Sequence, residues 1–221
     1  MPAILSGGRT TVPILQVGGK RIQDSTRILL WLDEKRGPLS LLPRTAAERD
    51  ETLAIEARFD KVGEHVVRYA YSTTLDDAES VIRYWTLDAL PKEAAVIRKR
   101  FPLLRWIFRR KLMMSASGVK RSRAVVEEGL AFIDARIADG RRYLATDQLT
   151  LADLTAAALL APLVCPDEHP VYSSARYRAG VAPLVRDWQE RPAFAWVRAI
   201  YREHRGVFPR AEQIKQALDA E

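Results

Sequence analysis

The sequence predicts an α+β fold in which a short strand–strand–helix module precedes a long all-α domain. Three observations support this prediction. Two β-rich runs, Val12–Val17 and Lys20–Gln23, flank the pair Gly18-Gly19. Helical patterns fill most of the chain after residue 44. Among them, Leu149–Val164 (LTLADLTAAALLAPLV) is apolar on nearly every side, which is typical of a helix buried inside a helical domain.

The bulk composition is that of a globular protein of one or two domains. The chain has 221 residues, 48% of them hydrophobic and 29% charged, with a formal charge of +7 that favours acidic partners. A single cysteine, Cys165, excludes an internal disulfide framework and favours a reducing, cytoplasmic setting. The three histidines are far apart in sequence, so we expect no metal site. Residues 1–10 are too short and too polar to be a signal peptide.

The N-terminal module is expected to cover residues 1–37. Gly18-Gly19 predicts a tight turn, so the two β-rich runs form a hairpin. Asp24 and Ser25 are residue types that cap helices, and an apolar stripe follows them up to Lys35-Arg36-Gly37, an orderly helix end. Residues 38–44 contain two prolines and are expected to form the linker.

The all-α domain is expected to cover residues 45–221. Thr45 and Glu48 have capping-box spacing, and a long helix follows until Asp76-Asp77 interrupts it. The later segments are expected to be helical at 81–90, 92–100, 102–113, 123–139, 181–190 and 192–204, with a loop at 115–118. In the central helix, Thr150 and Asp153 form a capping box.

Two phrases of the sequence resemble a known family. Residues 11–37 (TVPILQVGGKRIQDSTRILLWLDEKRG) are similar to the second half of the thioredoxin-like domain of glutathione transferases. Residues 143–153 (YLATDQLTLAD) resemble the phrase that opens the central buried helix of the C-terminal domain in the same superfamily. The order and spacing of both phrases agree with the family. The chain is therefore identified as similar to bacterial-type glutathione S-transferases, with a shortened, partial thioredoxin-like module.

The resemblance implies a glutathione site in this module. Ser25 would hold the γ-glutamyl carboxylate at the helix N-terminus, with help from Asp24. The backbone of Val12, before a proline that is cis in the family, would pair with the cysteinyl part of glutathione at Val12-Pro13. The alternatives are that Asp24 or Ser25 only caps a helix and that Pro13 only marks an edge strand.

The departure from the family concerns catalysis. Glutathione transferases carry an activating Tyr, Ser or Cys near the end of the first strand, and no residue here matches it, so the catalytic residue is unknown. Before the Val12 strand stand 11 residues, whereas a βαβ unit needs about 30. Either the true start lies upstream of Met1, or the protein has only half of the domain. We expect the former, because nothing compensates for the loss.

Three further features have competing interpretations. Tyr69, Tyr84 and Trp85 are expected to line an acceptor pocket by analogy with the family, or to pack in the core. The basic tract 98–123 would be the solvated face of a bundle helix whose aromatic side packs inward, or a surface for nucleic acid or membrane. Cys165, in an apolar context, is expected to be inert.

The resulting expectation is a cytoplasmic glutathione S-transferase homologue that joins the glutathione thiol to a small electrophile. Glutathione is the co-substrate, no metal is expected, and a homodimer is implied by the resemblance alone. The alternative is a non-catalytic binding or interaction protein of the same fold. A basic surface that binds nucleic acid or membrane is the less favoured hypothesis, so neither partner is expected.

Overall fold

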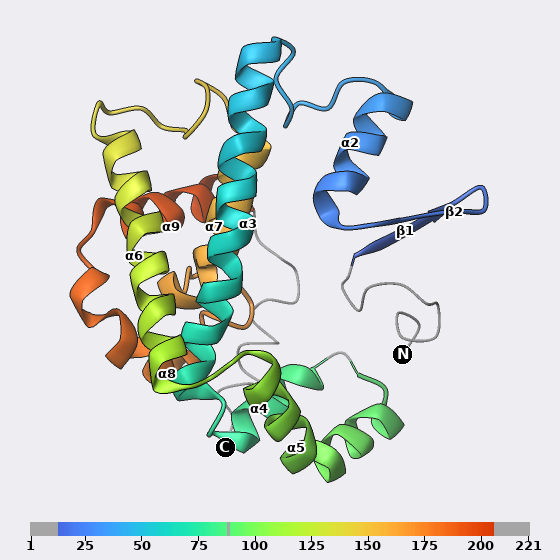
Figure 1. Cartoon of the computed structure of the whole chain (residues 1–221), viewed down its shortest axis with the longest axis vertical. Coiled ribbons are helices and arrows are strands. Elements are labelled where there is room, and N and C mark those ends of the chain that lie inside the picture. Colours follow the sequence, from blue (N-terminus) through green and yellow to red (C-terminus); the bar gives the residue numbers. More distant parts are fainter. Residues whose placement is uncertain (1–12, 88, 206–221) are drawn as a thin grey trace. The chain divides into compact units, whose positions relative to one another are not determined.

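The computed structural model describes residues 13–87 and 89–205, which divide into two compact units between Asp50 and Glu51. The first unit contains β1 (Ile14–Val17), β2 (Lys20–Gln23), α2 (Ser25–Arg36) and the start of α3 (Ala46–Thr74) (Figure 1). The second contains the rest of α3 and the following elements: α4 (Ala78–Trp85), α5 (Pro91–Lys111), α6 (Ala116–Ile137), α7 (Leu151–Val164), α8 (Ala175–Val185), the 3₁₀ turn η1 (Arg186–Trp188) and α9 (Pro192–His204).

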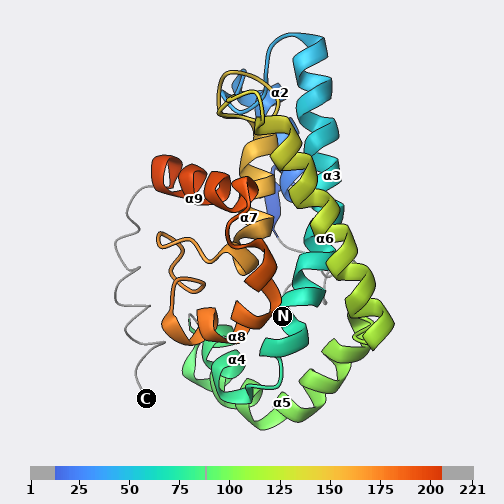
Figure 2. The ribbon, with the colours of Figure 1, turned by 90° about the vertical axis from the view of Figure 1, so that its left-hand side faces the viewer.

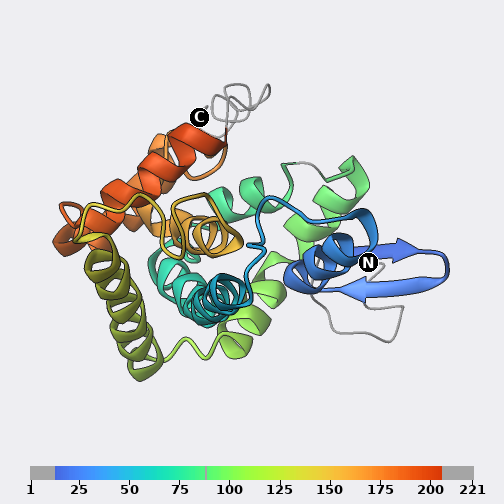
Figure 3. The same ribbon diagram turned by 90° about the horizontal axis from the view of Figure 1, so that it is seen from above.

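The hairpin of the first unit is confirmed. Strands β1 and β2 are antiparallel, with Val17 opposite Lys20, so that Gly18 and Gly19 form a two-residue turn (Figure 3). Their φ angles are 51° and 75°. Two consecutive positive φ values are what a type I′ hairpin turn requires, and glycine adopts them without strain. Strand β1 begins at Ile14, and Val12 lies outside the described residues.

Helix α2 begins and ends where the sequence predicts. The Asp24 carboxylate caps its first turn, and the helix ends at Gly37, whose φ is 97°. The segment after α2 is tied back to the helix by Asp33, which accepts a 2.7 Å hydrogen bond from the Leu39 N–H and pairs with Arg49 at 2.9 Å. These contacts hold the irregular residues before α3 in place.

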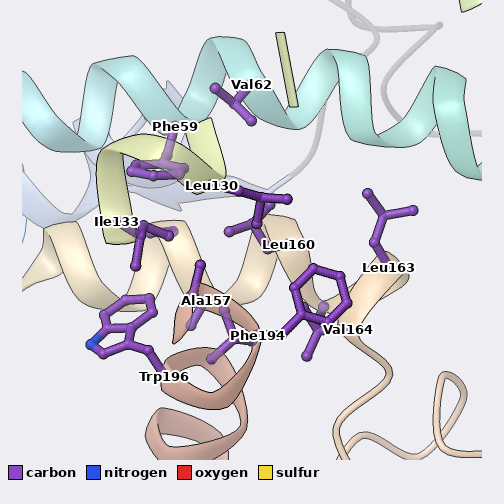
Figure 4. Packing of buried hydrophobic residues seen from close by; sticks show 14 of the residues in the cluster. Phe59, Val62, Leu130, Ile133, Ala157, Leu160, Leu163, Val164, Phe194 and Trp196 are labelled. Atoms are coloured by element: carbon purple, nitrogen blue, oxygen red, sulfur yellow. The ribbon is translucent and has the colours of Figure 1, made fainter. Parts of the chain in front are cut away.

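The core of the helical unit is built around α7, as its apolar sequence predicts. Side chains of α3, α6, α7 and α9 meet there: Phe59, Val62, Leu130, Ile133, Ala157, Leu160, Phe194 and Trp196 (Figure 4). The alanines of α7 leave room for neighbouring helices to approach closely. Two glycines serve the same purpose, because a Cβ on Gly63 would lie 2.9 Å from Leu159 and one on Gly129 would lie 3.1 Å from Val62.

A second, smaller core joins α4 and α5 to the C-terminal end of α3. Its buried members are Leu75, Val81, Ile82 and Phe101. Helices α4 and α5 lie at the end of α3 in both side views (Figures 1 and 2). No helix in the described ranges is long and apolar enough to cross a membrane.

Three expectations for the helical unit were wrong. The helix expected at 81–90 is α4, which begins at Ala78 and already ends at Trp85. The basic segments 92–100 and 102–113 form one helix, α5, because Pro102 is tolerated inside it. The predicted loop at 115–118 is instead the start of α6. There the Ser115 side chain accepts a 3.1 Å hydrogen bond from the Gly118 N–H, so the small polar residues form a helix cap and first turn.

Candidate functional site

The N-terminus of α2 brings together three of the residues that sequence analysis singled out. The Asp24 N–H donates to the Pro13 carbonyl oxygen at 3.2 Å, which places Pro13 beside the helix start. Ser25 is the first residue of α2, and both Asp24 and Ser25 are exposed. Val12, which was also singled out, lies outside the described residues.

Asp24 has an unusual backbone conformation. Its φ is 92° and its ψ is 130°, although it is not a glycine. A side chain at such a φ costs about 1–3 kcal/mol, and residues of this kind concentrate at ligand-binding positions. Part of the cost is offset because the Asp24 Oδ1 accepts the Arg27 N–H at 3.0 Å. Capping therefore occupies one side of the carboxylate at this turn, and the exposed Ser25 hydroxyl stands at the positive end of the helix dipole.

The helical unit contains an aromatic pocket of about 420 Å³. It lies between the second half of α3, α4, α5, the end of α7, the segment after α7 and the start of α8. The lining residues are Val67, Ala70, Tyr71, Thr74, Val81, Tyr84, Trp85, Phe108, Pro162, His169, Val171, Tyr172 and Tyr177. We call it the aromatic pocket. Its volume is within the range of small-molecule sites, and seven of its thirteen lining residues carry an aromatic ring, counting the imidazole of histidine.

The structure places Tyr84 and Trp85 in this pocket but not Tyr69. Tyr69 is buried in the main core, where its hydroxyl donates to the Leu184 carbonyl oxygen at 3.0 Å and its ring packs against Trp188. Tyr69 and Tyr84 are both on helices of the helical unit, yet only Tyr84 reaches the pocket. For Tyr69, the observed contacts are those of core packing.

His169 is a neutral hydrogen-bond donor at the pocket wall. Its Nδ1 accepts the backbone N–H groups of Val171 at 3.2 Å and Tyr172 at 3.1 Å. An acceptor at Nδ1 requires the proton on Nε2. Burial, reinforced by the positive charge of Arg205, lowers the pKa of His169 to about 4. The ring also stacks on Tyr172, with centroids 3.9 Å apart. The Nε2–H is therefore the polar group of the ring that these backbone contacts leave unused.

Tyr71 supplies a second donor. The Trp85 Nε1–H donates to the Tyr71 hydroxyl oxygen at 3.1 Å, which leaves the hydroxyl proton of Tyr71 available. Burial raises the pKa of Tyr172 to about 12 and that of Tyr84 above its ordinary value, so these hydroxyls keep their protons. Since His169 is neutral, the lining contains no charged side chain. Such a pocket favours a neutral, flat, apolar molecule that carries a hydrogen-bond acceptor.

Thr150 and Asp153 form the predicted capping box at the start of α7. The Asp153 carboxylate accepts the Thr150 N–H and hydroxyl, both at 2.8 Å, and the Leu144 N–H at 2.7 Å. Asp153 is fully buried, and desolvation raises its pKa despite these donors. The pair therefore fixes the entry of the central helix and connects it to the preceding loop, which is a structural role.

Cys165 ends α7 in a left-handed conformation, with a φ of 54°. A separate cavity of about 340 Å³ adjoins it, lined in part by Arg178 and Arg198. Burial nevertheless raises the pKa of the Cys165 thiol to about 12. Nucleophilic cysteines need a lowered pKa, so this thiol lacks the reactivity that catalysis requires.

Sequence reasoning missed most of the pocket lining. Tyr71 and Phe108 share their helices with many other apolar residues, and His169, Tyr172 and Tyr177 follow α7 in what reads as an irregular loop. One signal was available, because three rings within nine residues is a high density for a loop. Among the described residues, no group of three or more His, Cys, Asp or Glu could hold a metal ion.

Residues 116–191 match the family model described as "Glutathione S-transferase, C-terminal domain". The match begins at the first residue of α6, includes all of α7 with its capping box, and ends just before α9. The comparison with curated proteins found no match. The chain therefore contains a glutathione S-transferase C-terminal domain, which confirms the resemblance drawn from its sequence. The α+β class is confirmed as well, with a two-stranded sheet before a mostly helical body.

Proposed function

We propose that this protein is a cytoplasmic glutathione S-transferase homologue that joins the glutathione thiol to a neutral aromatic electrophile. The observation that carries the proposal is the uncharged, ring-lined pocket within the helical unit. The family match adds to it, because the matched domain contributes Pro162, His169 and the rings of Tyr172 and Tyr177 to the pocket wall. Homodimer formation is part of the proposal by resemblance.

The donors of the pocket indicate the class of electrophile. The His169 Nε2–H and the Tyr71 hydroxyl both suit an oxygen acceptor such as a carbonyl or nitro group. These same groups withdraw electrons from an attached ring or double bond, and a hydrogen bond to their oxygen increases that effect. Nitroarenes and α,β-unsaturated aryl ketones combine a flat apolar body with such an acceptor. We propose them as the acceptor class.

The glutathione side of the proposal rests on the start of α2. A helix N-terminus offers free N–H groups and partial positive charge to a carboxylate. Ser25 stands there with an exposed hydroxyl, beside the strained backbone of Asp24 and close to Pro13. In the reaction, the thiol loses its proton to solvent and the sulfur forms a bond to the electrophilic carbon. With a chloroarene, chloride leaves with the electron pair of the broken carbon–chlorine bond. With an α,β-unsaturated ketone, the C=C π bond breaks and the resulting enolate takes a proton from solvent at the α-carbon.

The test is a steady-state assay with glutathione and chlorodinitrobenzene, in which the start of α2 and the aromatic pocket are altered separately. His169→Asn keeps an acceptor for the two backbone N–H groups but removes the Nε2–H donor. We expect it to raise KM for the electrophile by about 2- to 12-fold, the equivalent of one neutral hydrogen bond, and to leave KM for glutathione unchanged. Ser25→Ala should instead raise KM for glutathione by about 10-fold or more and leave KM for the electrophile unchanged. The larger effect is expected because the lost hydrogen bond is to a charged carboxylate.

Tyr69→Phe is the matched control for the aromatic pocket. It removes a tyrosine hydroxyl from the same helix as Tyr71 but outside the pocket, so neither KM should change. Absence of product above the uncatalysed rate would contradict conjugation. In that case, calorimetric binding of glutathione and of an unreactive dinitroarene to the same protein would establish the non-catalytic alternative.

A further inference from the structure

Helix α5 presents an outer face that combines exposed apolar side chains with cations that form no ion pair within residues 13–87 and 89–205. Eight large hydrophobic residues are exposed in the described part of the chain, and six of them lie between residues 90 and 113: Leu90, Val96, Leu103, Trp106, Ile107 and Met113. Trp106 is 58% exposed and Leu103 is 50% exposed. Val96, Leu103 and Ile107 are separated by seven and four residues, so they form one stripe along the helix.

The inner face of α5 explains why the outer one stays exposed. Phe101 is buried, and Phe108 packs beside it against α3 and α4. Trp85 packs against both rings, with centroids 5.7 Å from Phe101 and 4.8 Å from Phe108. Arg105 and Arg109 pair with Asp76, the latter at 2.7 Å. The helix is therefore attached to the domain by one side, and the stripe on the other side has no role in that attachment.

The cations around the stripe have no acidic partner among the described residues. Lys92, Arg98, Lys99, Arg100, Arg110 and Lys111 form no ion pair there, and from Ala94 to Lys111 the helix contains no Asp or Glu. The Arg110 guanidinium lies over the exposed Trp106 ring, 5.5 Å from its centroid. From the sequence, we expected the aromatic side of this tract to pack inward. Trp106 does not, which changes the interpretation of the tract.

We propose that α5 lies on the surface of an anionic lipid bilayer. The stripe of Val96, Leu103 and Ile107, with Trp106 beside it, enters the boundary between headgroups and acyl chains, and the flanking lysines and arginines contact lipid phosphates. A basic helix with an apolar stripe and an interfacial tryptophan has the composition of helices that bind in the plane of a membrane. Each of its cations near the surface adds to the attraction for acidic lipids.

Other occupants fit the surface less well. A nucleic acid would neutralise the cations but leave the apolar stripe against a polyanion. A second copy of the chain in a two-fold arrangement would bring the same six cations together with their own image. Of these three occupants, the anionic bilayer satisfies both the charge and the apolar stripe. The inference does not depend on the proposed catalytic function, because none of the outer-face residues lines the aromatic pocket.

The test is co-sedimentation of the full chain with lipid vesicles. We expect binding to phosphatidylcholine vesicles that contain about one third phosphatidylglycerol, and little binding to phosphatidylcholine alone. Binding should weaken as salt rises, because exposed charges are screened. Lys99→Gln/Arg100→Gln should lower the partition coefficient about 25-fold, at about fivefold per charge. Lys61→Gln/Arg202→Gln, which removes two exposed cations elsewhere, is the control and should lower it less than threefold.

Two further measurements separate lipid from the other occupants. Leu103→Ser/Ile107→Ser leaves the charge unchanged and should still reduce vesicle binding at least tenfold. Vesicles with brominated acyl chains should quench tryptophan fluorescence in the wild type, and Trp106→Phe should abolish most of that quenching. The proposal is overturned if the protein does not bind acidic vesicles at low salt. It is also overturned if the serine variant binds them normally, or if the chain binds duplex DNA more tightly than vesicles through the same cations.

Discussion

His169 should make the stability of the protein depend on pH between about 4 and 6.5. In the folded state its Nδ1 accepts two backbone N–H groups, and a proton added to Nδ1 would face both donors. Burial and Arg205 oppose that proton as well, and the pKa falls from 6.5 to about 4. Between about pH 4 and 6.5 the unfolded chain therefore binds a proton at His169 that the folded chain does not bind. Stability is fully present above pH 6.5 and is lost as the pH falls.

The size of the effect follows from the shift in pKa. A change from 6.5 to about 4 corresponds to about 3 kcal/mol when complete, of which about 2 kcal/mol should already be lost at pH 5. The assay is urea denaturation of the wild type and of His169→Asn at pH 7 and at pH 5. The Asn amide oxygen can accept the same N–H groups but does not titrate. The variant should therefore lose about 2 kcal/mol less than the wild type between these pH values. Equal losses in the two proteins would refute the reasoning, as would a wild type that becomes more stable on acidification.

Three other predictions concern the helical unit. Asp153→Ala should destabilise the folded protein by about 3–5 kcal/mol, because two backbone N–H groups lose a charged acceptor. Thr150→Ala should destabilise it by about 0.5–2 kcal/mol. Strict additivity of the two changes in a double-mutant cycle would show that the residues do not act as a pair. Cys165 should resist Ellman's reagent at pH 8 in the native protein and react fully in denaturant, since burial raises the pKa of its thiol to about 12; rapid native labelling would contradict this. Gly118→Ala should lower the unfolding free energy by more than about 1 kcal/mol, because the new Cβ would collide with the Met113 carbonyl oxygen. This is the reverse of the ordinary preference of helices for alanine, and an unchanged denaturation midpoint would count against it.

Local signals in the sequence predict the elements that local chemistry determines. The hairpin follows from Gly18-Gly19, whose positive φ values other residues adopt at a cost, and α7 begins where Thr150 and Asp153 cap it. The same local reasoning failed at Pro102, because a proline costs one hydrogen bond inside a helix and packing of Phe101 and Phe108 against α3 and α4 offsets that loss.

The aromatic pocket was harder to predict than the fold because the packing of helices assembles it. The start of α2 is continuous in sequence, so Asp24 and Ser25 can be found without a structure. What the structure adds there is the positive φ of Asp24. The aromatic pocket joins residues that are about 100 positions apart, such as Tyr71 and His169. No local pattern marks these as neighbours, and Tyr69 shows that a tyrosine two residues away on the same helix takes a different role.

We expect the aromatic pocket to bind a neutral aromatic molecule with an oxygen acceptor. Hydrogen exchange of the full chain, with and without saturating dinitrotoluene, tests it most directly. We expect slower exchange in the peptide that contains Val171 and Tyr172 and in the last turns of α3, with no change beside the separate cavity at Ala182 and Phe194. Saturable binding that protects the Ala182 and Phe194 region instead, or no protection anywhere, would contradict it.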